Sequence, residues 1–400
     1  MDAKENRANR IAIIASSVML MSTMIISSVL ADIAEVYPNK SVDSIQMVLT
    51  IPSLMGMLFA FIAGPLSIKF AQKSLVMGGL FLGLIGGVLG FFFGEKSLTI
   101  LYVSSLLIGI NQGLNGALSK SLVPEFFVGQ ERNDMMGYQA SASTGGSMII
   151  TFFAAILAGI AWNYSYLILF LFIPAMFVVQ RNLTYVAPIP VKKDEKSGVK
   201  DKLNSAAYFT AAITFFTFLF LYTYQLNIAM FIKSAGLGDA TVSGYVNTIF
   251  PVTGMLTGFL FGKFRKVMQY QTVQFGLLVL AAGFMGIKIF GSLPAAFFAS
   301  FCTGVAQAFV ISSCMLATAE HSPASLRATA ISLAMGMLNL GMFCSPLVVN
   351  RIADLFGASE VAFKFMISAV GLIALAVVYT ALCPVFYKKR NTAEEIQIKA

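Results

Sequence analysis

Three amide side chains stand close together near the middle of a long apolar segment. Asn111, Gln112 and Asn115 occupy positions i, i+1 and i+4 within residues 98–119. In a helix these positions fall within an arc of about 100°, so we expect all three on one face. Amides donate and accept hydrogen bonds without carrying a charge. Such a face could bind an uncharged polar solute, or it could join neighbouring helices, where each bond contributes about 0.6 kcal/mol on average.

Charged side chains are distributed very differently. All 18 carboxylates fall in loops, tails or the ends of apolar segments, and no Lys or Arg falls at the middle of one. Because an ionisable group inside a bilayer is costly and normally functional, this pattern argues against a buried proton relay or a fixed cation for an anionic substrate. The acidic residues nearest to the membrane are Asp32, Glu35 and Glu320, which are the candidates for proton coupling. For Asp32 the alternative is a solvated helix end.

The composition predicts the elements that carry these groups. Hydrophobic residues make up 58% of the chain and charged residues 11%, and the mean hydropathy is +0.81, whereas soluble domains hold about 25% charged residues. About 20 apolar residues are enough for a helix to cross the hydrocarbon core. The sequence therefore predicts an all-α polytopic membrane protein with twelve transmembrane helices. Their approximate ranges are 11–30, 44–67, 75–93, 98–119, 136–161, 164–179, 206–231, 243–261, 271–290, 294–318, 328–350 and 363–386.

The third of these spans is rich in glycine. Six glycines fall within residues 75–93. Small residues let helix backbones approach closely in lipid, so this span is expected to pack tightly against its neighbours.

The two halves of the chain repeat one another. The pattern G-x-L-x-x-K-F occurs at residues 64–70 and again 194 residues later, at 258–264. At an offset of 195, Gln112 matches Gln307 and Arg132 matches Arg327. Three matches in register indicate a duplicated chain. We expect two pseudo-symmetric six-helix bundles, over residues 1–180 and 206–400, joined by a linker over residues 181–205.

Basic residues predict the orientation. With a cytoplasmic N-terminus, 21 Lys and Arg residues outside the spans lie on the cytoplasmic side and 6 on the other. This split places both termini and the linker in the cytoplasm of a cell-membrane protein. It also explains the net charge of +9 as a topology signal and an attraction to anionic lipid, not to nucleic acid. The four cysteines fall in apolar spans without metal-ligand spacing, so we expect no metal and no cofactor.

This organisation resembles the 12-helix type of the major facilitator superfamily of secondary transporters, over about residues 10–390. The resemblance is carried by six plus six spans, a basic linker, the repeated G-x-L-x-x-K segment, and an E-R-x-x-x-x-G motif at residues 131–137. It implies two bundles around a central cavity that opens alternately to either side. It also implies conformational roles for residues of the repeated segments and of the entries to the fifth and eleventh spans. These residues are Gly64, Lys69, Lys73, Arg132, Gly258, Lys263 and Arg327.

Three departures from the family pattern bear on mechanism. Ile68 stands where the family's loop usually has Asp, which weakens the charge lock that this loop normally makes. Ser105 stands where many proton-coupled members have Arg, which disfavours proton coupling. The antiporter signature, a G-P pair followed by paired glycines, is missing around Gly145 and Gly146, which disfavours efflux.

The resemblance also implies a substrate pathway. In this family helices one, four, seven and ten line it, and the polar residues near the middle of those spans become candidates for substrate binding. They are Thr23, Ser27, Asn111, Gln112, Asn115, Tyr222, Gln225, Thr303 and Gln307. For each of them, hydrogen bonding between helices is the alternative role.

The leading interpretation is a monomeric secondary transporter, active or facilitative, for a small neutral or amphipathic organic solute, with H+ coupling left open. The alternative is a proton-coupled pump for multiple drugs or other hydrophobic compounds, which the 21 Met and 36 Phe residues favour. A membrane enzyme would need a catalytic constellation, and the chain has one His and neither a Gly-rich phosphate loop nor H-E-x-x-H. A sensor would usually add a soluble domain, whereas the linker is about 25 residues long.

Overall fold

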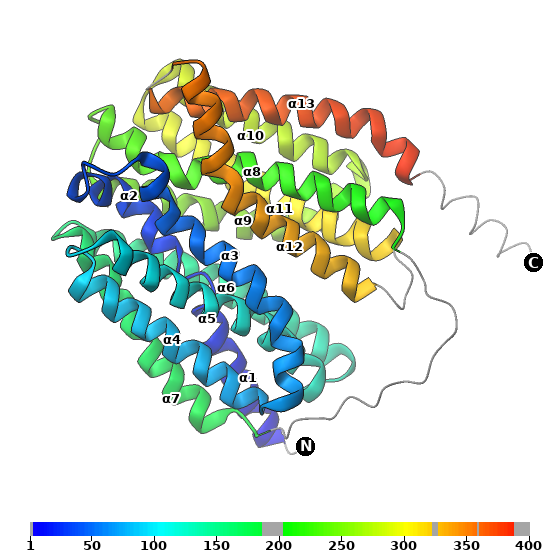
Figure 1. The fold of residues 1–400 in the computed structure, drawn as a ribbon. Coiled ribbons are helices and arrows are strands. Elements are labelled where there is room, and N and C mark those ends of the chain that lie inside the picture. The colour runs from blue at the N-terminus through cyan, green and yellow to red at the C-terminus, as the bar shows by residue number, and fades with distance from the viewer. Residues whose placement is uncertain (1–2, 186–202, 322–326, 358–359, 388–400) are drawn as a thin grey trace, which may run out of the picture. The chain divides into compact units, whose positions relative to one another are not determined.

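The computed structural model describes residues 3–185, 203–321, 327–357 and 360–387 (Figure 1). Within these ranges the regular elements are all helices, which confirms the all-α prediction. The helices are α1 Ala3–Val18, α2 Met24–Val36, α3 Val42–Lys69, α4 Gln72–Phe93, α5 Leu98–Phe126, α6 Gly129–Ala158, the 3₁₀ helix η1 Trp162–Leu171, α7 Phe172–Asn182, α8 Ser205–Ser234, α9 Ala240–Met268, α10 Gln271–Phe290, α11 Leu293–His321, α12 Arg327–Leu355 and α13 Val361–Tyr387.

Ten helical segments of the described chain are long and apolar enough to cross a membrane. They correspond to ten of the predicted spans, and those at 11–30 and 243–261 are not among them. The count of twelve therefore stays a prediction. Several large apolar side chains on these helices are exposed, among them Phe61, Phe92 and Phe177 at 50%, 59% and 67%.

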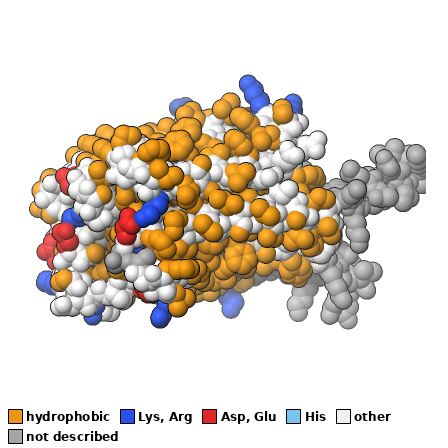
Figure 2. Space-filling view, turned by 90° about the horizontal axis from the view of Figure 1, so that it is seen from above, with side chains coloured by type: hydrophobic (Ala, Val, Ile, Leu, Met, Phe, Trp, Pro, Cys, Tyr) orange, Lys and Arg blue, Asp and Glu red, His pale blue; other side chains and the backbone are white. Residues whose placement is uncertain are grey.

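Apolar side chains also cover most of the face drawn in Figure 2, while charged side chains are few and lie mostly at its margins. Such surfaces are unfavourable in water and suit contact with lipid. Together with the ten apolar segments, they identify a multi-pass membrane protein.

The first predicted span, 11–30, is not one continuous helix. α1 ends at Val18, α2 begins at Met24, and residues 19–23 form a turn. The hydroxyls of Ser16 and Ser17 both donate to the carbonyl oxygen of Ile13, at 2.9 and 2.7 Å. Such bonds compete with the helical ladder and bend helices. The prediction of a single helix was wrong because neither Gly nor Pro marks the break in the sequence.

The glycine-rich span packs closely, as expected. A Cβ atom on Gly86 of α4 would lie 2.8 Å from the carbonyl oxygen of Ser104 in α5. A Cβ atom on Gly87 would lie 2.7 Å from Cβ of Leu169 in η1. Gly78, on the same helix, faces open space. The backbone of α4 therefore contacts both neighbours directly along one side.

The described helices fall into two compact units. The first contains α1–α7 together with residues 228–252, and the second contains residues 205–227 and 253–387. In the second unit Ser368 of α13 donates its hydroxyl to Oγ1 of Thr223 in α8, at 2.8 Å. The hydroxyl of Tyr379 donates to the carbonyl oxygen of Tyr270, at 3.0 Å. These bonds connect α13 to two other parts of its own unit.

Candidate functional site

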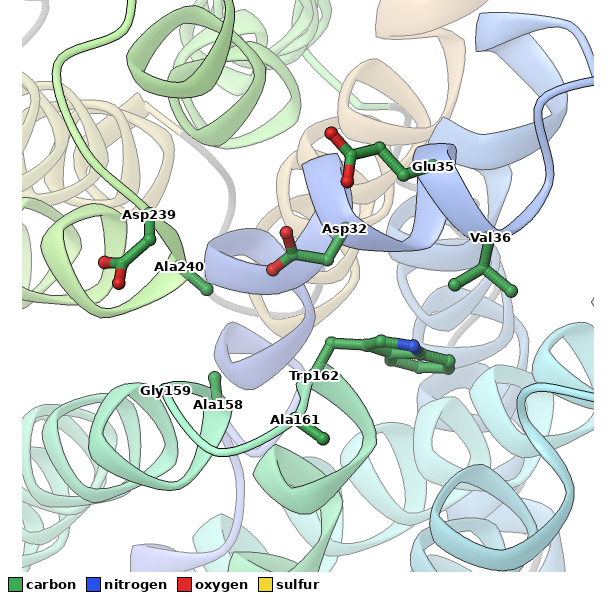
Figure 3. A pocket seen from close by; sticks show the side chains of 9 residues that line it. All are labelled: Asp32, Glu35, Val36, Ala158, Gly159, Ala161, Trp162, Asp239 and Ala240. Atoms are coloured by element: carbon green, nitrogen blue, oxygen red, sulfur yellow. The ribbon is translucent and has the colours of Figure 1, made fainter.

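A pocket of about 390 Å³ opens in the first unit, where α2 ends and α9 begins (Figure 3). We call it the acidic-end pocket. It is lined by Asp32, Glu35, Val36, Ala158, Gly159, Ala161, Trp162, Asp239 and Ala240. Three of these residues are acidic, and alanine and glycine supply most of the remaining wall. The small residues leave room beside the carboxylates for a solute or a side chain.

Lys233, in the last turn of α8, neutralises part of this charge. Its ammonium group forms ion pairs with Asp32 and, at 2.9 Å, with Glu35. The side chains of Asp32, Lys233 and Glu35 are 20%, 30% and 68% exposed. The solvated-end interpretation of Asp32 is thereby corrected, since this carboxylate is ion-paired and largely covered. Two carboxylates on one helix hold one cation from another, which fixes the end of α2 to the end of α8.

The other polar residues of the pocket have different roles. Asp239 accepts the backbone N–H of Val242 at 3.1 Å, so it caps the start of α9. Trp162, at the start of η1, is 7% exposed, and its indole N–H has no hydrogen-bond partner. Figure 3 shows its ring forming one wall of the pocket beside Val36. The pocket thus combines net negative charge with an aromatic wall.

A second group of polar residues lies deeper in the first unit, beside the break between α1 and α2. The amide of Asn111 donates to the carbonyl oxygen of Met19 at 3.5 Å. The amide of Asn115 donates to Oδ1 of Asn111 at 2.7 Å. Further along α5, Ser119 accepts the amide of Gln139 at 2.6 Å. All four side chains are buried, so the amides of α5 form a connected row that reaches the broken helix.

Gln112 is not part of that row. It is half-buried, and its Oε1 atom has no hydrogen-bond partner. Its side chain lies toward Gly56 of α3, since a Cβ atom added to Gly56 would be 3.9 Å from it. Thr23 and Ser27 are buried. Oγ of Ser27 lies 3.4 Å from the amide nitrogen of Asn247, which donates to it. The structure therefore brings Asn111 and Asn115 together near the turn that holds Thr23 and sets Gln112 apart.

The candidates of the second unit are mostly covered as well. Tyr222 and Gln225 of α8 are 1% and 3% exposed. Thr303 of α11 is buried and donates its hydroxyl to the carbonyl oxygen of Ala299 in the same helix, at 2.7 Å. Gln307, one turn further, is half-buried. Thr303 thus satisfies its hydroxyl within its own helix, whereas Gln307 remains partly exposed.

The repeated G-x-L-x-x-K segments are helical. Gly64 and Lys69 lie in the last turns of α3, and Gly258 and Lys263 lie within α9. The predicted spans 44–67 and 243–261 left Lys69 and Lys263 outside the helices, and this is corrected, because the helices continue to Lys69 and Met268. After the first segment, Lys73 donates to the carbonyl oxygen of Gln180 at 2.7 Å.

Three predicted residues have side chains outside the described part of the structure: Arg132, Glu320 and Arg327. Next to the first of them, Glu131 of α6 forms an ion pair with Arg10 of α1 at 2.6 Å. The guanidinium of Arg10 also lies 5.9 Å from the ring centroid of Phe127. Only the opposite charges of these residues could have suggested the pair, because 121 positions separate them in the sequence.

The family model described as Major Facilitator Superfamily matches residues 12–271 and again 207–398. The chain belongs to the Major Facilitator Superfamily. The resemblance inferred from the sequence is confirmed, and this superfamily member is a transporter, not an enzyme. None of the curated protein sequences matches the chain.

Solved transporters share the fold over nearly the whole chain. The POT family transporter PepTSo is 12% identical, with 95% of this chain and 98% of that chain covered and a TM-score of 0.75. A bacterial homologue of the human lysosomal transporter Spinster is 14% identical, with 98% and 99% covered and a TM-score of 0.73. A mutant of the nucleoside transporter NupG is 11% identical, with 94% and 99% covered and a TM-score of 0.78. At these identities the likeness establishes the fold, not the substrate.

Two features of this region could not be found by reading the sequence. The pairing of Lys233 with Asp32 joins positions 201 residues apart. The break at residues 19–23 left one weak signal, the adjacent pair Ser16 and Ser17. Serines that bond back to the preceding turn can disturb a helix.

Proposed function

We propose that this transporter moves a small organic solute, neutral or weakly amphipathic, across the cell membrane by alternating access. The observation that carries the proposal is the chemistry of the buried polar groups. Among the described residues Lys364, near the start of α13, is the one buried residue with a charged side chain, whereas buried Asn, Gln, Ser and Thr side chains are numerous. A site made of amides and hydroxyls suits an uncharged solute, because a charged solute would lose its hydration without a counter-charge.

In this proposal residues 1–180 and 206–400 rock against each other about the linker at 181–205. Asp32 and Lys233 fall on opposite sides of this division, so opening the acidic end requires their ion pair to break. With both termini in the cytoplasm, as the distribution of Lys and Arg supports, the acidic-end pocket faces outward. The solute would bind between the polar side chains of the two halves. The candidates remain Thr23, Ser27, Asn111, Gln112, Asn115, Tyr222, Gln225, Thr303 and Gln307.

The transporter would act as a monomer in lipid. H+ coupling would need a carboxylate that gains and loses a proton during the cycle. Asp32 and Glu35 are the described candidates, and both are ion-paired with Lys233. Facilitated diffusion requires no such group, so the coupling is decided by the flux experiment below.

The test is counterflow of radiolabelled solutes into liposomes that contain the purified protein, with and without an imposed pH gradient. The panel holds nucleosides, sugars, dipeptides, carboxylic acids and hydrophobic cations. We expect exchange of an uncharged or zwitterionic class and its loss in Asn111→Leu. Asn339→Leu is the control, since Asn339 also lies in a membrane-spanning helix and its amide donates within that helix, to Met335 at 3.0 Å.

Four outcomes separate the alternatives. Exchange that ignores pH identifies a facilitator. Accumulation driven by the gradient and abolished by Asp32→Asn, with exchange retained, identifies Asp32 as the proton site. Gradient-driven extrusion of hydrophobic cations alone would replace the proposal with multidrug efflux, and flux of anions alone would refute a neutral solute.

A further inference from the structure

The acidic-end pocket has an apolar floor and a charged rim. Ala158, Trp162 and Ala240 are 7%, 7% and 6% exposed, so they lie at its most covered part. Glu35 and Asp239 are exposed, so they lie where the pocket meets solvent. Ligand pockets hold apolar groups on their covered walls and fix the orientation of the ligand with a few polar side chains. The pocket therefore matches a small molecule with one apolar end and one polar end.

The charge of the pocket decides which polar end it favours. Its lining contains three carboxylates and neither Lys nor Arg. The ammonium of Lys233 pairs with two of these carboxylates, Asp32 and Glu35. Three negative charges and one positive charge leave an excess of negative charge. Charges interact more strongly beside a protein than in bulk water, so this excess favours a cationic ligand and disfavours an anionic one.

The contacts of Lys233 show how the pocket can hold an ammonium group. Oδ1 of Asp32 and Oε2 of Glu35 both contact Nζ of Lys233, the latter at 2.9 Å. The two carboxylates thus stand within hydrogen-bonding reach of a single ammonium nitrogen. Both of them line the pocket, whereas Lys233 does not. An ammonium ion that enters the pocket from solvent meets the same pair of oxygen acceptors and competes with Lys233 for them.

The size and spacing of the pocket favour an organic cation over a metal ion. Its volume is about 390 Å³, within the range of about 300–1,000 Å³ that is usual for small-molecule sites. Among the residues that the structure describes, no three His, Cys, Asp or Glu side chains lie close enough together to hold a metal ion. One wall is fixed by close packing of α6 against α9, because a Cβ atom on Gly159 would lie 2.6 Å from Oγ1 of Thr241.

Trp162 adds a hydrogen-bond donor at the covered end of the pocket. Its indole N–H is buried and has no partner. In Figure 3 the indole nitrogen lies on the edge of the ring nearer to Val36, another lining residue. An indole nitrogen donates and does not accept, and leaving a buried donor unpaired is unfavourable. A ligand oxygen at this edge of the ring would therefore be stabilised.

We propose that the acidic-end pocket binds small amphipathic organic ammonium ions, whose ammonium group takes the place of Lys233 between Asp32 and Glu35. The apolar end of the ligand lies against the floor, and an oxygen beside it accepts the indole N–H of Trp162. This binding goes beyond the proposed transport function, which gives the pocket no ligand. It rests on that function for one consequence only: a ligand that releases Lys233 favours opening of the acidic end.

The test is equilibrium binding of radiolabelled phenylethanolamine, a protonated amine at neutral pH, to the purified full-length protein. We expect saturable binding. Phenylethylene glycol, with a hydroxyl in place of the ammonium, should bind at least about tenfold more weakly. Lys233→Met removes the competing ammonium, so it should tighten binding about tenfold. Asp32→Asn should weaken binding about fivefold or more. Glu360→Gln is the control, since it removes an exposed carboxylate that pairs with Lys288 in the second unit, and it should leave binding unchanged.

A second comparison tests the contact with the indole. Phenethylamine lacks the hydroxyl of phenylethanolamine, so it should bind the unaltered protein about two- to tenfold more weakly. Trp162→Phe keeps an aromatic ring and removes the N–H, so both amines should bind this variant equally. If Trp162 only shaped the wall, the variant would lower both affinities and leave their ratio unchanged, which would refute the hydrogen bond.

The proposal is overturned if neither the unaltered protein nor Lys233→Met binds the amine saturably. Binding that Asn111→Leu abolishes and Asp32→Asn leaves unchanged would place the amine at the candidate solute site and would equally overturn it. Binding is measured without transport, so the two proposals fail separately. Absence of amine binding leaves the transport proposal standing, and absence of exchange for every solute leaves the binding proposal standing.

Discussion

Replacing Lys233 by Met should open the acidic-end pocket. The substitution removes the ammonium that Asp32 and Glu35 share and keeps an unbranched apolar side chain of similar length. The Glu35 pair is largely exposed, and exposed pairs contribute about 0.2–1 kcal/mol. Asp32, at 20% exposure, is left with an unbalanced and mostly covered carboxylate, and breaking a fully buried pair costs about 3–5 kcal/mol.

The expected loss lies between these limits, at about 1–2 kcal/mol. Only the state in which the ends of α2 and α8 are joined is affected, so the ratio of closed to open protein should fall about 5–30-fold. This intermediate free energy follows from the partial exposure of the Asp32 and Lys233 side chains. Asp32→Asn should lower the ratio of closed to open protein by a similar factor. The double variant should be no more open than either single variant, because all three remove the Asp32–Lys233 ion pair.

The assay uses Trp162, the one tryptophan in the sequence. It lines the pocket and is 7% exposed. Opening should make its fluorescence more sensitive to acrylamide. Lys288→Met is the matched control, since Lys288 pairs with Glu360 at 2.5 Å with exposures of 28% and 61%, in the second unit. If acrylamide quenches Lys233→Met no more than it quenches the unaltered protein and the control, the Lys233 ion pairs do not hold the pocket closed.

Two further outcomes are expected. Gly86→Ala should lower the free energy of unfolding by about 1–3 kcal/mol, because the added methyl group would overpack against Ser104. Gly78→Ala on the same helix meets open space, so it should leave that free energy unchanged or raise it by up to about 1 kcal/mol. Equal melting temperatures of the two variants in detergent would contradict the close contact. A double-mutant cycle of Arg10→Gln and Glu131→Gln should give a coupling energy below about 1 kcal/mol, because both side chains are about 40% exposed. A coupling energy of several kcal/mol would show that the ion pair is shielded from water in the folded protein.

Much of the architecture could be predicted from the sequence because membrane helices consist of long continuous apolar segments. The glycines of residues 75–93 predicted close helix packing, and Gly86 and Gly87 contact the neighbouring helices closely. The superfamily followed from repeated motifs that the family comparison confirmed. These signals are local or periodic in the sequence, so they can be recognised without knowledge of tertiary contacts.

The contacts of the candidate site residues could be predicted from the sequence only in part. The expected common face of Asn111, Gln112 and Asn115 divides, since the first and last form a row toward Met19 while Gln112 lies toward Gly56. Helical spacing gives an angle but not the neighbour that each side chain meets. The turn at residues 19–23 depends on Ser16 and Ser17 bonding back to Ile13 and on Gly146, more than 120 positions away, approaching Val18. Contacts of this range leave no periodic trace in the sequence.

The 3₁₀ helix at the start of the sixth span changes how this segment fits a bilayer. A 3₁₀ helix rises about 2.0 Å per residue instead of about 1.5 Å. The ten residues of η1 and the eleven of α7 therefore reach roughly 36 Å, about 5 Å more than a uniform α-helix of the same length. A hydrocarbon core is about 30 Å thick, so this span has length to spare for tilting or for a thicker, sterol-rich membrane. Lipid chain length should consequently influence the end of the segment that carries Trp162.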